Sequence, residues 1–158
     1  MTSRSWLFAA LVGACVDAFA GNLCDVARPD DFEGAGRASL EMYVEDLAGS
    51  RGAPAGLAPR DVKLTLAAGE PKPAPGGVTA GEISCGADGG PPYRIALYPA
   101  ALEGRPLAVA YNTVAHEFQH IVQVRRDHLP CGVRGNDELA RYEAEARAVA
   151  EELVPACR

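Results

Sequence analysis

Short runs in the middle of the chain alternate between apolar and polar residues, which is the spacing of half-buried β-strands. These runs cover residues 62–66, 78–83 and 93–98. Gly and Pro are frequent throughout residues 49–92, so this part of the chain excludes long helices. Residues 39–47 fit either a strand or a helix, because their apolar positions satisfy both spacings. The sequence therefore predicts a small sheet in the middle of the chain.

The pattern becomes helical after Pro106, which stands where a helix would begin. Residues 107–126 contain neither Gly nor Pro, whereas residues 129–135 contain both. Asn136 is a favourable N-cap for a second helix that runs to about Leu153. The sequence thus predicts an α+β fold in which a small mixed or antiparallel sheet is followed by two helices.

The size and charge of the chain exclude several classes of protein. Its 158 residues suit one domain, and its formal net charge is −6. The negative balance argues against binding nucleic acid or an anionic membrane by charge. No apolar run after residue 20 approaches the roughly 20 residues that span a bilayer. We therefore expect neither a nucleic-acid partner nor a membrane span.

The first 20 residues have the features of a secretory signal peptide. Arg4 provides a positive start, residues 6–16 are apolar, and residues 18–20 end the segment with small residues at the positions that a signal peptidase reads. Cleavage there would leave residues 21–158 as a single exported domain, periplasmic or secreted. Two alternatives stay open: the segment 12–15 resembles a lipobox, which would anchor the chain by lipid on Cys15, or the segment is retained as a buried helix.

The cysteines favour export. Apart from Cys15, the chain carries Cys24, Cys85, Cys131 and Cys157, a number that indicates two disulfides in an exported protein of this size. Three pairings are possible, and free buried thiols are a further alternative. We expect Cys24–Cys85 and Cys131–Cys157, because the second pair would tie a loop to the end of the last helix.

The segment 116–120 reads HExxH and falls on the first predicted helix. His116 and His120 are four residues apart, so both imidazoles lie on one face and can bind the same zinc ion. Glu117 can then take a proton from a zinc-bound water. On a helical wheel Glu117 falls within the apolar arc, where an unpaired carboxylate costs several kcal/mol. A cleft containing a metal and water would offset that cost; the alternative is a structural ion pair. The arc is formed by Ala110, Val114, Phe118, Ile121 and Val122.

A zinc peptidase site needs a third protein ligand, and the second helix offers two candidates. Glu143 shares its side of the helix with Leu139 and Ala150 and is expected to face inward. Glu145 lies on the side that looks solvated, together with Arg141. We therefore expect Glu143 as the ligand and keep Glu145 as the alternative. Other possible ligands have simpler roles near helix ends or in the loop; they are Asp127, His128, Asp137 and Glu138.

The HExxH helix followed by Glu143, 23 residues after His120, resembles the gluzincin branch of zinc metallopeptidases. The segment 143–146 resembles the second-helix motif of the short ImmA/IrrE-type peptidases and of the Ste24/HtpX group, so the likeness covers about residues 109–153. It implies a minimal zincin-like fold, with His116, His120 and Glu143 as zinc ligands and Glu117 as the catalytic base. The chain departs from the pattern at Arg147, where the family often has an acidic or amide residue.

The chemistry and the resemblance together predict an exported zinc-dependent metallopeptidase acting on peptides or proteins. The alternative is a catalytically inactive zinc-binding or interaction module of the cell envelope, stapled by disulfides. Tyr111, Tyr142 and His128 are the candidates for stabilising the oxyanion. The strand at 93–98 is either an edge strand that pairs with an extended substrate or an ordinary core strand. The acidic balance favours basic or neutral peptides.

Overall fold

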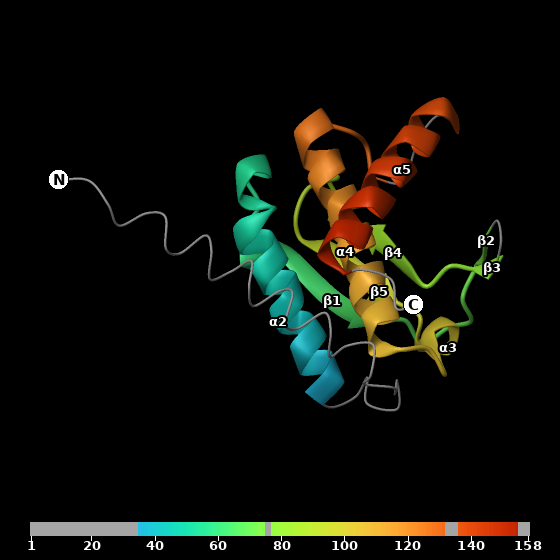
Figure 1. Cartoon of the computed structure of the whole chain (residues 1–158). Helices are drawn as coiled ribbons and strands as arrows, with labels where there is room; N and C mark the ends of the chain where they lie inside the picture. The colour runs from blue at the N-terminus through green and yellow to red at the C-terminus, as the bar shows by residue number, and fades with distance from the viewer. Residues whose placement is uncertain (1–34, 75–76, 132–135, 155–158) are drawn as a thin grey trace.

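The structure is a computed structural model that describes residues 35–74, 77–131 and 136–154. The expected signal peptide at residues 1–20, with Cys15, lies outside these residues, as do Cys24 and Cys157. The described residues form a mixed α+β fold with one small three-stranded sheet, as the sequence predicts. Figure 1 shows the helices gathered against this sheet.

The strands β1 (Val62–Leu66), β5 (Tyr93–Leu97) and β4 (Gly81–Ser84) form the sheet in the order β1-β5-β4. β1 runs parallel to β5, with Leu64 opposite Ile95, whereas β4 runs antiparallel to β5. The strand expected at 93–98 is therefore the central strand, which confirms the core-strand alternative and excludes the edge-strand alternative. The edge next to the candidate site belongs to β4.

The run predicted at 78–83 divides between two strands. β3 (Gly77–Val78) pairs antiparallel with β2 (Pro73–Ala74) in a separate two-stranded sheet, and β4 joins the main sheet. Gly77 and Gly81 each stand at the start of one of these short strands. Glycine weakens a continuous strand, which is consistent with the break between them.

The segment 39–47, which fitted two patterns, lies within helix α2 (Ala35–Ser50). Leu40, Val44 and Leu47 are buried at helical spacing, while Met42 is 69% exposed. Short helical turns follow at η2 (Ala53–Ala55), η3 (Pro59–Asp61) and α3 (Pro99–Leu102). None of the helices in the described part of the chain is long and apolar enough to cross a lipid bilayer.

Helix α4 (Leu107–Asp127) is the element around which the others pack. It contacts α2, strands β4 and β5, and helix α5 (Asn136–Leu153), so it lies between the sheet and the last helix (Figure 1). Its predicted apolar arc is largely buried, with Ala110, Val114, Phe118 and Ile121 at most 1% exposed. Both long helices have the bounds that the sequence indicated, to within a residue. Within the HExxH segment, residues 117–120 are buried and His116 is half-buried.

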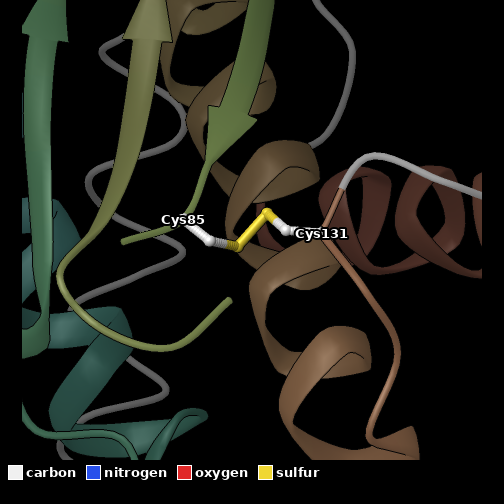
Figure 2. Close-up of a disulfide and its surroundings, with 2 residues drawn as sticks. All are labelled: Cys85 and Cys131. Atoms are coloured by element: carbon white, nitrogen blue, oxygen red, sulfur yellow. A yellow bond between two sulfur atoms is a disulfide. The ribbon is translucent and has the colours of Figure 1, made fainter. Parts of the chain in front are cut away.

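A disulfide joins Cys85 to Cys131, with the Cα atoms 6.0 Å apart. Figure 2 shows it linking the residue after β4 to the segment that follows α4. The expected pairs Cys24–Cys85 and Cys131–Cys157 are therefore wrong. The partners are distant in sequence, and only the packing of β4 against α4 brings them together.

Candidate metal centre

His116 and His120 lie one turn apart on α4 and point to the same place as Glu143 of α5. The Nε2 atom of His116 lies 3.1 Å from Oε2 of Glu143, and the Nε2 atom of His120 lies 3.1 Å from Oε1 of the same carboxylate. The two Nε2 atoms are also 3.1 Å apart. The three expected ligands thus converge, one ligand atom from each within 4.8 Å of the others.

The spacing of these atoms suits one small cation. Ligands bound tetrahedrally at the zinc–nitrogen and zinc–oxygen distances of about 2.0–2.1 Å are about 3.3 Å apart, close to the 3.1 Å found here. Two imidazoles and one carboxylate are a donor set that zinc accepts, with a fourth position left for solvent or substrate. The residues present therefore fit a metal ion of this kind.

Gln123 fixes the orientation of the His120 ring. Its Nε2 donates to the backbone carbonyl of Tyr142 at 3.0 Å, and its Oε1 lies 2.8 Å from Nδ1 of His120. Because a carbonyl can only accept, the amide nitrogen must face Tyr142 and the amide oxygen must face His120. Nδ1 of His120 therefore carries a proton, and in the neutral ring Nε2 presents its lone pair to Glu143 and His116, as a metal ligand requires.

Glu117 lies beside the ligands and is not one of them. It is 9% exposed and lines a cleft of about 810 Å³ together with His116, His120 and Glu143. The wheel prediction of an inward-facing carboxylate is confirmed. Its position next to an accessible space is the arrangement that a general base needs.

Strand β4 forms the opposite wall of this cleft, and Gly81 allows it to lie close to α4. A Cβ atom at Gly81 would be 2.7 Å from Cγ2 of Thr113 and 3.0 Å from Cγ of Glu117. Any larger residue at this position would require the side chains of Thr113 and Glu117, or the strand itself, to shift. Further along the strand, Lys72 and Tyr98 donate hydrogen bonds to Glu82, and the bond from Lys72 is the main cause of the lowered pKa of that carboxyl.

Glu145, the alternative ligand, is held elsewhere. It accepts hydrogen bonds from Nη1 of Arg126 at 2.7 Å and from Nε2 of Gln119 at 2.9 Å. Arg126 also binds Asp127, and these bonds lower the pKa of Glu145 and lower that of Asp127 to about 2. Both carboxylates therefore belong to a surface network around Arg126, outside the convergent group.

The remaining candidates also lie apart from the ligands. His128 is exposed and ends α4 in the left-handed conformation, with φ 53° and its N–H bonded to the carbonyl of Val124. Glu138 is exposed on α5, and the side chain of Asp137 lies outside the described part. Tyr111 and Tyr142 are 2% exposed and do not line the cleft, so the structure does not support Tyr111, Tyr142 or His128 as oxyanion donors.

Two residues of the site were not predicted from the sequence. Gln123 is fully buried, and its signal was a polar residue three positions after His120, between the apolar residues Val122 and Val124. Gly81 gave no signal, because its close approach to Glu117 depends on how β4 packs. Compared with family models, with curated proteins and with solved structures, the chain matches none of them.

Proposed function

We propose that this protein is an exported, zinc-dependent metallopeptidase of the gluzincin type. His116, His120 and Glu143 would hold the zinc ion, and Glu117 would act as the general base. The observation that carries the proposal is the convergence of the three ligand atoms beside Glu117 in one cleft. The alternative, a structural ion pair, would require only one partner for the Glu117 carboxylate. Instead, Glu117 and the three candidate ligands all line one accessible cleft.

The chain's own residues supply the proton transfers. A zinc ion bound by the three ligands would polarise the peptide carbonyl and make a water molecule more acidic. Glu117 takes a proton from the attacking water and delivers it to the leaving amine nitrogen. Glu117 is 9% exposed and lies against Gly81 of β4, so its side chain is held at the wall of the cleft where a substrate would bind.

The edge of β4 suits an extended peptide substrate. β4 ends the main sheet, and Gly81, Glu82 and Ile83 line the cleft. An extended chain can pair with an open strand edge through backbone hydrogen bonds, which would place its carbonyl groups along the row of site residues. The role that the sequence offered to the strand at 93–98 is thus proposed for β4.

The Cys85–Cys131 disulfide supports export. Disulfides persist in oxidising compartments and are rare where thiol reductants act. The proposed location is therefore the periplasm or the extracellular space, either as a released chain or anchored by lipid at Cys15.

Metal content and cleavage, measured on the same variants, test the proposal. We expect one zinc per chain in the wild type and in Glu117→Gln, and none in His120→Ala or Glu143→Ala. Glu145→Gln serves as the matched acid on the same helix and should keep its zinc. Cleavage of a peptide library should require both zinc and Glu117.

The outcomes separate the two functions considered. Zinc binding without any cleavage that depends on Glu117 would favour the inactive zinc-binding module. A wild-type chain that takes up no zinc after reconstitution would overturn both.

A further inference from the structure

Helix α5 forms one wall of the cleft and places three different kinds of side chain along it. Leu139, Glu143 and Arg147 are spaced four residues apart, and all three line the cleft. At 1.5 Å per residue, neighbours in this row are about 6 Å apart along the helix. The wall therefore offers an apolar group, a metal ligand and a guanidinium in that order.

Arg147 is available to a bound molecule. Of the described residues that line the cleft, it is the one with a Lys or Arg side chain, and it is exposed. No hydrogen bond or ion pair joins it to another described side chain, although Glu143 and Glu151 lie one turn away on the same helix. Glu143 instead faces the two histidines, and Glu82 on the opposite wall is bound by Lys72. A guanidinium placed in this way matches a carboxylate, which it binds with two parallel hydrogen bonds.

The other end of the row is apolar. Leu139 is 38% exposed and Val78 is 48% exposed, and both line the cleft, from α5 and β3 respectively. Of the large apolar side chains that the structure describes, only Met42 is comparably exposed, and it lies on α2. Exposed apolar side chains gathered at a cleft are typical of a binding surface.

We propose that the cleft selects peptides that carry a carboxylate on the Arg147 side of the metal ligands and an apolar side chain on the Leu139 side. The inference rests on the proposed function and names the substrate class. An extended peptide advances about 3.3 Å per residue, so both groups would lie within about two residues of the scissile bond. The carboxylate is either an acidic side chain or a free C-terminus. Arg147 thus provides a local positive group for a carboxylate, although Glu82, Glu117 and Glu143 also line the cleft.

Matched peptide pairs test the proposal. One pair exchanges Glu for Gln near the scissile bond, and a second exchanges a free C-terminus for an amide, so the two sources of carboxylate are measured separately. We expect kcat/KM of the wild type to favour the carboxylate in at least one pair by about tenfold or more. Arg147→Gln should bring that ratio close to one, and Arg147→Glu should reverse it. Arg60→Gln removes an exposed arginine outside the cleft and should leave the ratio unchanged.

A second variant separates the two ends of the cleft. Leu139→Ser should weaken the preference for an apolar over a polar residue and leave the carboxylate ratio as in the wild type. A carboxylate ratio near one in the wild type, or a ratio that survives Arg147→Gln, would overturn the role of Arg147. An equal loss of kcat for all peptides would also overturn it, since that result would indicate a general effect on catalysis.

Binding provides a readout that does not depend on turnover. Labelled versions of the same peptides can be titrated into Glu117→Gln and into Glu117→Gln/Arg147→Gln, with fluorescence anisotropy as the signal. We expect the carboxylate peptide to bind about tenfold or more tightly than its amide partner only when Arg147 is present. Such binding without cleavage by the wild type would remove the proposed peptidase and keep the carboxylate site. Equal binding of both peptides would remove the site whatever the outcome for catalysis.

Discussion

The side-chain oxygen of Gln123 lies 2.8 Å from Nδ1 of His120, deep between helices α4 and α5. The amide nitrogen of the same residue donates to the backbone of Tyr142. One buried side chain therefore both orients a candidate ligand and joins the two helices that carry the candidate metal centre. Glu143 directly follows Tyr142 in the sequence, so the bond from Gln123 to the Tyr142 backbone also helps to position Glu143 relative to His120.

Gln123→Leu should weaken metal binding without removing a ligand. The change frees the His120 ring and leaves the Tyr142 carbonyl without its side-chain donor, so we expect zinc affinity to fall about 10- to 100-fold. Competition with a coloured zinc chelator measures the change. Gln119→Leu is the matched control on the same helix, because Gln119 bonds Glu145, and its zinc affinity should stay as in the wild type. Equal affinities in the wild type and Gln123→Leu would refute the orienting role.

Gly81→Ala should impair cleavage by pushing β4 away from α4. The added methyl would meet Thr113 at 2.7 Å and Glu117 at 3.0 Å, and overpacking of this kind typically costs about 1–3 kcal/mol. We expect a lower thermal midpoint and a loss of kcat/KM with zinc content retained. Gly69→Ala has open space around the new methyl and should change neither. Normal cleavage by Gly81→Ala would show that the close approach is not needed.

Removal of the Cys85–Cys131 disulfide should destabilise the protein by about 4 kcal/mol in the chain-entropy description of a loop of this length. The two cysteines are 46 residues apart. Denaturant unfolding of Cys85→Ser, Cys131→Ser and the double variant measures the effect. The double variant should lose no more than either single one, because both break the same bond. Additive losses, or a disulfide-linked peptide that pairs either cysteine with another partner, would contradict the assignment.

The Arg126 network should make stability depend on acid pH. Hydrogen bonds from Arg126 lower the pKa of Glu145 and lower that of Asp127 to about 2. Carboxyls with depressed pKa stabilise the folded state above their unfolded values near pH 4, and that stability is lost as pH falls through the folded values. We therefore expect the free energy of unfolding to fall between about pH 4.5 and pH 2.

The neighbouring arginine offers the control for that pH dependence. Arg126→Gln should flatten the fall in stability over the same range, as followed by urea unfolding at a series of pH values. Arg125→Gln removes the same charge from the adjacent position and should retain the wild-type slope. Equal slopes in the two variants would show that the network does not set the acid response.

Local patterns in the sequence were sufficient for most of the helices and strands. The alternation of Leu40, Met42 and Val44 was also compatible with a strand at 39–47. In the structure Met42 is 69% exposed, whereas Leu47 is buried with Leu40 and Val44 on a single helical face. The HExxH motif and the inward side of α5 predicted His116, Glu117, His120 and Glu143, because a helix converts spacing in sequence directly into spacing on a face. Helical spacing alone places His116 and His120 on one face, whereas the approach of Glu143 to them also requires α5 to pack against α4.

Features that depend on non-local packing could not be predicted in this way. β5 is central because β1 pairs with it on one side and β4 on the other, and no residue in the strand itself encodes its neighbours. The partner of Cys85 follows from where β4 ends beside α4, which gives Cys131 (Figure 2). The exposure of Arg147 to the cleft and the close approach of Gly81 to Glu117 could not be predicted for the same reason. Each depends on how two separate elements pack together.

The disulfide also bears on how the candidate centre is assembled. The disulfide closes a loop from Cys85 to Cys131 that contains both His116 and His120. Glu143 follows 12 residues after Cys131. The disulfide favours the folded state, in which the three candidate ligand atoms converge, because it restricts the unfolded chain. Oxidation and loading of a cation are then thermodynamically linked, and each favours the other. If the proposed centre binds a cation, the reduced chain should therefore bind that cation less tightly than the oxidised chain.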